Sequence, residues 1–113
     1  MTHRAWLGTS FAIDDFVLPE PAEDNYVRYG IAQREVCPDT EREHVQFYIE
    51  FTRPVRMAHV KRIVADPAAH LEQRRGTRDQ ARQYCSKEET RKPGTQPQEV
   101  PLWIADLILF YTD

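Results

Sequence analysis

Apolar and polar residues alternate most clearly between Glu43 and Thr52 (EHVQFYIEFT). The apolar positions are Val45, Phe47, Ile49 and Phe51, and the positions between them are His44, Gln46, Tyr48 and Glu50. Successive side chains of a strand point to opposite faces of its sheet. This pattern therefore predicts a strand with one face against a core and the other face polar.

The rest of the chain predicts three further strands and two helices. The strands are Ala5–Ser10, Tyr26–Glu35 and Ala68–Arg74, and 11–25 is a loop or a poorly formed helix. After Pro54, a helical pattern carries Val55, Met57, Ala58, Val60, Ile63 and Val64 and stops before Pro67. A second helix begins at Thr77, which forms a capping box with Gln80, and frays near Lys92.

This order of elements predicts an α+β fold, with an antiparallel central sheet and helices packed on it in a two-layer architecture. The apolar stripe of the third strand is expected to pack against Met57, Val60, Ile63 and Val64, which leaves the opposite face for a site. We expect residues 1–95 to form the domain. Residues 96–113 are expected to be a linker and an apolar tail (102–112), which packs back on the sheet or joins two copies of the chain.

Composition and charge narrow the functional classes. The chain has 113 residues, enough for one small domain, and no apolar run long enough to span a membrane. Cys37 and Cys85 give no disulfide framework, which favours a reducing compartment. Residues 1–60 hold six Lys or Arg against ten Asp or Glu, whereas residues 61–92 hold nine against five. This split fits carboxylates that hold a metal and cations that hold phosphates, or simply two solvated faces.

His44 and Gln46 lie two residues apart on the predicted third strand, so their side chains point the same way. Glu35 is the last residue of the preceding predicted strand. If a turn joins the two strands in an antiparallel pair, Glu35 would lie near His44. A nitrogen, an amide oxygen and a carboxylate suit Mn²⁺ or Mg²⁺, with water completing the coordination. Glu41 and Glu43 are competing ligands. The alternative is that His44 and Gln46 form only the solvent-facing side of a half-buried strand.

Tyr84 and Lys87 are three residues apart, which places them on one face of the predicted second helix. A tyrosine is a poor nucleophile at neutral pH because its phenol is protonated. It becomes reactive when a cation favours the phenolate and a metal polarises the bond under attack. The alternative is a half-buried tyrosine on an amphipathic helix beside a solvated lysine.

In combination, these motifs resemble the HUH endonuclease superfamily, and specifically the replication-initiator proteins of circovirus-like single-stranded DNA viruses. Gly76–Glu89 (GTRDQARQYCSKEE) is similar to the third motif of that family. EHVQFYIEF is similar to the second motif, in the branch where glutamine replaces the second histidine. Trp6–Ser10 (WLGTS) is the best match to the first motif but lacks its asparagines. The resemblance covers roughly residues 4–92.

The resemblance implies a ferredoxin- or RRM-like HUH fold and a sequence-specific enzyme that nicks and rejoins single-stranded DNA at an origin stem-loop. Tyr84 would form a 5′-phosphotyrosine that initiates rolling-circle replication, assisted by Lys87 and by Mn²⁺ or Mg²⁺ at Glu35, His44 and Gln46. The expected DNA contacts are Trp6, Thr9, Ser10, Arg74, Arg75, Arg78 and Arg82. The site of action would be the host nucleus for a eukaryotic virus and otherwise the cytoplasm.

Two other classes of function fit parts of the sequence. One is a non-catalytic module that binds single-stranded nucleic acid on an RRM-like sheet, with Tyr29 and Tyr48 as stacking platforms. The other is a partner-binding domain with neither metal nor DNA. A metal-dependent covalent adduct with DNA distinguishes the enzyme from both.

Overall fold

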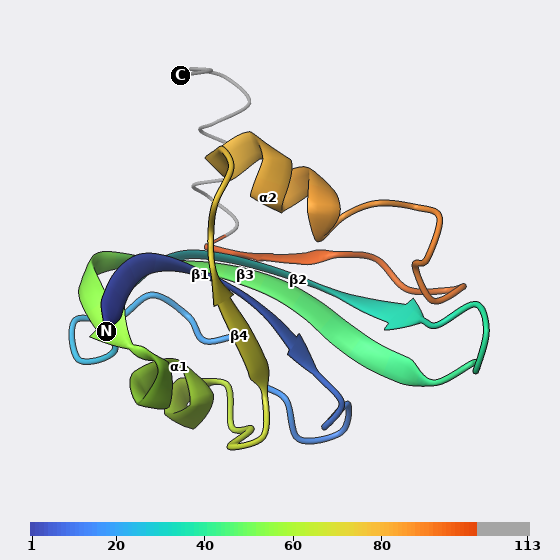
Figure 1. The fold of residues 1–113 in the computed structure, drawn as a ribbon, viewed down its shortest axis with the longest axis horizontal. Helices are drawn as coiled ribbons and strands as arrows, with labels where there is room; N and C mark the ends of the chain where they lie inside the picture. Colours follow the sequence, from blue (N-terminus) through green and yellow to red (C-terminus); the bar gives the residue numbers. More distant parts are fainter. Residues whose placement is uncertain (102–113) are drawn as a thin grey trace.

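The computed structural model describes residues 1–101 and contains a five-stranded antiparallel sheet in the order β4-β1-β3-β2-β5. The elements are β1 (Thr2–Ser10), β2 (Val27–Val36), β3 (Glu43–Arg56), α1 (Met57–Ile63), β4 (His70–Gln73), α2 (Arg78–Tyr84) and β5 (Gln98–Val100). The predicted α+β fold with an antiparallel central sheet is confirmed. Figure 1 shows that α1 and α2 lie on opposite faces of this sheet.

The larger core lies on the α1 face of the sheet. It contains the predicted stripe Val45, Phe47, Ile49 and Phe51, together with Val60 and Val64. Ile63 packs at its margin, but Met57 is 39% exposed, so the prediction that Met57 covers the stripe is wrong. Met57 is the first residue of α1, which turns it away from the sheet.

A second core lies on the α2 face, where Ala81 and Cys85 pack against Tyr29, Ile31 and Tyr48. The positions between the residues of the apolar stripe are therefore also buried: Tyr48 completely, and Gln46 and Glu50 nearly so. Because the sheet is covered on both faces, alternate positions of β3 are both buried, and the strand does not have one apolar face and one solvent-exposed face.

Two boundaries in the middle of the chain differ from the prediction. β3 continues through Pro54 to Arg56, because the register with β1 breaks between His3 and Ala5 and the strand tolerates proline at such an irregularity. α2 ends at Tyr84 rather than near Lys92. The Ser86 hydroxyl donates to the Arg82 carbonyl at 2.8 Å, and the chain then turns back toward β2.

The expectation of a linker is wrong for Gln98–Val100, which pair with Gly30–Ala32 of β2 as an edge strand. The apolar tail 102–112 lies outside the described residues. Among residues 1–101, neither helix has the length and apolar character needed to cross a membrane.

Candidate active site

The predicted site residues of the strands share the α2 face of the sheet. Glu35 of β2 pairs with His44 of β3, and Gln46 of β3 lies between Thr9 of β1 and Gln33 of β2. Paired residues in an antiparallel sheet point to the same face, and so do residues two apart on one strand. The sheet therefore presents two adjacent rows of polar side chains beneath the end of α2.

Glu35 and His44 are in direct contact. His44 Nε2 lies 3.1 Å from Glu35 Oε1, while the other carboxylate oxygen accepts a 3.1 Å hydrogen bond from Gln33 Nε2. Only 3% of Glu35 is exposed, so its charge is nearly removed from water. On the far side of the imidazole ring, Nδ1 lies 3.6 Å from Cys37 Sγ. A buried carboxylate facing an imidazole nitrogen fits a divalent cation, which would compensate the buried charge.

Gln46 lies in the neighbouring row, but its amide is bonded to β1. Its Nε2 donates to the Gly8 carbonyl at 2.8 Å, and its Oε1 accepts from the Thr9 hydroxyl at 3.2 Å. Within residues 1–101, no three His, Cys, Asp or Glu side chains form a metal-binding group. A third protein ligand beside Glu35 and His44 would therefore be an amide oxygen, and Gln46 carries one on the correct face.

The two competing acids are directed elsewhere. Glu43 accepts hydrogen bonds from Lys92 at 2.9 Å and from Arg34 at 2.7 Å, and the bond from Lys92 is the largest of the effects that lower the pKa of Glu43 from its usual 4.5. Glu41 is exposed in the turn between β2 and β3. Neither side chain joins the contact between Glu35 and His44.

Tyr84 is the last residue of α2 and is 48% exposed. It lines a cleft of about 230 Å³ whose other walls are Leu7, Gly8, Thr9, Gln46, His70 and Glu72. The structure thus brings Tyr84 together with Gln46 and Thr9, although they come from different elements. A cleft of this size, with a phenol on one side and amide and hydroxyl groups on the other, can receive a single phosphate group.

Lys87 contacts Tyr84, but through a different geometry from the one predicted. Because α2 ends at Tyr84, Lys87 follows the helix instead of lying one turn further along it. Its Nζ lies 4.1 Å from the centroid of the Tyr84 ring. A cation over an aromatic face interacts with the ring electrostatically.

The segment that follows Tyr84 is tied to the strand of the predicted metal ligands. Arg91 Nε donates to Gln33 Oε1 at 2.7 Å, and Arg91 Nη2 donates to the Ser86 carbonyl at 2.7 Å. Cys85 is completely buried, which raises the pKa of its thiol to about 12; the negative charge of Glu35 adds to this shift. These contacts fix the end of α2 over the row that contains Glu35.

Two of the predicted DNA contacts are wrong. Trp6 is buried in the core on the α1 face, and its indole nitrogen donates to the Val55 carbonyl at 3.3 Å. Ser10 is also completely buried and donates to Asp66 Oδ2 at 2.6 Å. Both residues alternate with Thr9, which lines the cleft, so strand geometry directs them to the opposite face.

The predicted DNA-binding arginines are partly engaged within the protein. Arg82 binds the Glu99 carboxylate at 2.8 Å and also donates to the Tyr29 hydroxyl at 2.7 Å. Arg74 donates to the Tyr48 hydroxyl at 2.7 Å, and Arg78 Nε lies 2.8 Å from a Glu50 carboxylate oxygen, at an angle unsuitable for a hydrogen bond. Arg75 is exposed.

Burial also excludes the proposed stacking platforms. Tyr29 and Tyr48 are completely buried beneath α2. Burial raises the pKa of each phenol well above the ordinary tyrosine value of 10. Neither ring has a free face on which a nucleotide base could stack. The interpretation of the sheet as an RRM-like surface that uses these two tyrosines is therefore wrong.

Sequence reasoning missed three residues near the site. His70 and Glu72, 3.0 Å apart on β4, line the cleft beside Tyr84. Their two-residue spacing on a short predicted strand was the available signal. Phe11 is 45% exposed, with its ring centroid 5.6 Å from that of His44. Its position in an irregular loop left no periodic pattern.

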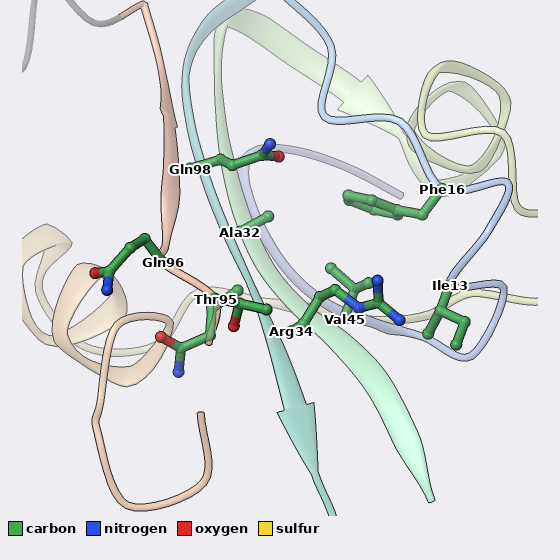
Figure 2. Close-up of a pocket in the computed structure, with 9 residues that line it drawn as sticks. Ile13, Phe16, Ala32, Arg34, Val45, Thr95, Gln96 and Gln98 are labelled. Atoms are coloured by element: carbon green, nitrogen blue, oxygen red, sulfur yellow. The ribbon is translucent and has the colours of Figure 1, made fainter. Parts of the chain in front are cut away.

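Another cavity, of about 340 Å³, lies on the α1 face of β2 and β3 (Figure 2). Ile13 and Phe16 line one side of it, and Gln96 and Gln98 line the other. It contains neither Tyr84 nor the pair formed by Glu35 and His44. Of the predicted nucleophile and metal ligands, Tyr84 and Gln46 line the smaller cleft on the α2 face, whereas Glu35 and His44 line neither cavity.

Comparison with known proteins assigns the chain to a family. Residues 5–88 match the model of a family described as "Putative viral replication protein". The chain belongs to this family. The match contains Glu35, His44, Gln46, Tyr84 and Lys87, so the family assignment covers every residue predicted for metal binding or catalysis. The resemblance to viral replication initiators is thereby confirmed.

The chain is similar to replication proteins of several viruses. It is 36% identical over 74 residues to the master replication protein of banana bunchy top virus, which covers 66% of this chain and 25% of that protein. It is 40% identical over 68 residues to the master replication protein of milk vetch dwarf virus, covering 60% and 23%. The replication-associated protein of human associated cyclovirus 1 is 34% identical over 62 residues, covering 55% and 22%. The chain thus matches about a quarter of the length of these relatives.

Proposed function

We propose that this protein is a metal-dependent endonuclease that nicks and rejoins single-stranded DNA at a viral origin stem-loop and so initiates rolling-circle replication. The observation that carries the proposal is the shared cleft of Tyr84 and Gln46, on the face where Glu35 meets His44. A nucleophile and an amide oxygen share this cleft, and a buried carboxylate–imidazole pair lies on the same face of the sheet. The family membership supports the role in replication.

In the proposed reaction, the scissile phosphate enters the cleft between Tyr84 and Gln46. Glu35, His44 and Gln46 would hold Mn²⁺ or Mg²⁺, which withdraws electron density from the phosphate when bound. The Tyr84 oxygen attacks phosphorus, the bond to the 3′ oxygen breaks, and the released oxygen takes up a proton. The products are a 5′-phosphotyrosine and a free 3′-hydroxyl. Lys87 stabilises the negative charge that the phenol oxygen must carry to attack.

The same arrangement supports strand joining. The phosphotyrosine retains a phosphodiester linkage, so a 3′-hydroxyl can attack the phosphorus and displace Tyr84. This reverse step needs no ATP. Position and charge stabilisation therefore supply most of the catalysis in both directions.

The test is a covalent adduct assay with single-stranded oligonucleotides labelled at the 3′ end. A randomised pool is incubated with the protein and Mn²⁺ and separated on a denaturing gel, where the labelled 3′ fragment should migrate with the protein. Tyr84→Phe should remove the adduct while DNA binding is retained. Tyr26→Phe is the matched control and should form it. The proposal fails if the Tyr84→Phe protein still becomes labelled, or if the unmodified protein never does.

A further inference from the structure

A second cleft, of about 360 Å³, opens at the other end of α2 from Tyr84. Four of the side chains that line it are arginines, namely Arg4, Arg28, Arg74 and Arg78. The acid among its lining residues is Glu50. The arginines come from four places in the chain: β1, β2, the segment after β4, and the first turn of α2.

Two irregularities of the sheet lie at this cleft. The register between β1 and β3 breaks between His3 and Ala5, which leaves Arg4 unpaired. The register between β2 and β3 breaks between Val27 and Tyr29, which makes Arg28 the extra residue of a bulge. Both breaks adjoin Glu50. Bulges redirect side chains and recur beside functional sites, and these two bring a cation from each neighbouring strand to one cavity.

Glu50 organises the other two arginines. Its carboxylate, which is buried, accepts a 2.6 Å hydrogen bond from the Tyr48 hydroxyl. Arg74 and Arg78 both approach the same oxygen, Oε2, at 3.7 and 2.8 Å. Each guanidinium has five N–H donors, so one shared carboxylate oxygen leaves most of them unused.

The charges in the cleft do not balance. Four guanidinium groups face one carboxylate, and among residues 1–101 no acidic side chain forms an ion pair with Arg4 or Arg28. Like charges gathered in one cavity repel each other, and a concave wall concentrates their field. The excess positive charge is therefore suited to an anionic ligand. Planar guanidinium groups match the oxygens of a phosphate better than any other cationic side chain does.

We propose that this arginine cleft binds a backbone phosphate of the DNA strand, at a position away from the one that is cut. The inference rests on the proposed function for the identity of the ligand. Glu50 lies four residues along β3 from Gln46, which corresponds to roughly 13 Å. The cleft would hold the strand in place while Tyr84, at the other end of α2, acts on the scissile phosphate. It contacts phosphate and not bases, so it adds affinity without sequence preference.

The salt dependence of DNA binding tests this proposal directly. Affinity for a single-stranded oligonucleotide is measured by fluorescence anisotropy at several salt concentrations, with EDTA present so that no strand is cut. Each lost phosphate contact lowers the slope of log affinity against log salt by about 0.7 on single strands. Because both arginines would hold the same phosphate, Arg4→Ala/Arg28→Ala should lower the slope by roughly 0.7. Arg4→Lys/Arg28→Lys keeps the charges and should retain most of the slope of the unmodified protein. This variant also controls for loss of folding.

The matched control is Arg53→Ala/Arg56→Ala, which removes two exposed arginines that line a separate cavity. This variant should bind with an unchanged slope, and an equal fall would show that general positive charge, not the cleft, holds the strand. Replacing the oligonucleotide by an abasic strand should preserve the difference between the variants. Inorganic phosphate, added at the concentration of the phosphate groups in the oligonucleotide, should not displace the oligonucleotide. Effective displacement would make the cleft a site for free phosphate and overturn the proposal.

Failure of this inference is distinguishable from failure of the proposed function. If Arg4→Ala/Arg28→Ala has the slope of the unmodified protein, the arginine cleft does not hold DNA, whether or not the adduct forms. If the slope falls as expected but no adduct forms, the cleft binds DNA and the nicking chemistry is wrong.

Discussion

Glu35 carries a charge that the fold has almost completely removed from water. Its partners are the His44 imidazole and the Gln33 amide, neither of which is a permanent cation. A buried carboxylate with no permanent cation beside it is costly, so a bound divalent ion should stabilise the folded protein. The stabilisation grows with the concentration of the ion and reaches about 2.7 kcal/mol at 100 times its dissociation constant.

We expect Mn²⁺ to raise the melting temperature of the protein, and EDTA to reverse the rise. Glu35→Gln should remove most of this shift because it removes the charged ligand. Glu43→Gln should retain it, since the Glu43 carboxylate binds Lys92 and Arg34 instead. Thermal unfolding with and without Mn²⁺ measures the shift in melting temperature for both variants and for the unmodified protein. An unchanged shift in Glu35→Gln would place the metal elsewhere.

Lys87 should accelerate cleavage without being essential. Its ammonium group contacts the Tyr84 ring and can stabilise the phenolate, but it does not form the bond to phosphorus. Lys87→Ala should slow adduct formation by on the order of 10²-fold. Lys87→Arg should recover part of the rate because it retains the charge. Single-turnover kinetics provide the comparison, and an unaltered rate in Lys87→Ala would remove Lys87 from the mechanism.

The two cysteines should differ sharply in reactivity. Burial raises the pKa of the Cys85 thiol from its ordinary 9.0 to about 12, whereas Cys37 is partly exposed. At pH 8, iodoacetamide should modify Cys37 in the native protein and leave Cys85 intact, as measured by mass spectrometry.

The same shift has a consequence for stability. A raised pKa in the folded state favours the protonated thiol, so its contribution is present below pH 9 and is lost as the pH rises toward 12. The free energy of unfolding should fall over this pH interval. In the Cys85→Ala variant, the free energy of unfolding should fall less steeply. Rapid labelling of Cys85 at pH 8 would contradict the burial on which both expectations rest.

At the scale of single elements, α2 is short and depends on its ends. It has only seven residues, and its first turn is closed by the reciprocal bonds between Thr77 and Gln80. Removing a side-chain cap costs about 1 kcal/mol. Since Tyr84 lies at the other end of this helix, fraying from Thr77 should also displace the nucleophile.

Thr77→Ala should therefore lower the free energy of unfolding by about 1 kcal/mol and reduce cleavage as well. The matched control is Thr2→Ala, at an exposed position at the start of β1. Urea unfolding and the adduct assay are measured on both variants. Equal stability of Thr77→Ala and Thr2→Ala would mean that packing of Ala81 and Cys85 alone holds the helix.

The sequence predicted those element features that depend on neighbouring residues. The alternation in β3 and the capping box of α2 are local patterns, and both are present in the structure. The end of α2 was not predictable in this way. It depends on Arg91, which bonds to Gln33 of a strand far away in the chain. β5 was missed for the same reason, because three residues acquire a strand conformation only by pairing with β2.

At the scale of the whole molecule, the position of α2 decided which predictions held. Residue types, spacing and the family resemblance together predicted Glu35, His44, Gln46 and Tyr84 as site residues, and strand pairing puts the first three on one face. Spacing does not reveal what covers that face. Tyr29 and Tyr48 therefore looked available for DNA, although α2 buries both. Trp6 and Ser10 were misplaced because the first strand carried no clear alternation.

The edges of the described sheet are formed by its two shortest strands. β4 has four residues and β5 has three, whereas β3 in the centre has fourteen. A long exposed edge offers unpaired N–H and C=O groups to any other extended chain, which is the usual start of aggregation between sheets. Here each edge offers only a few such groups, and Arg74 and Arg75 follow directly after β4. The brevity of the outer strands thus protects the sheet from adding strands of neighbouring molecules.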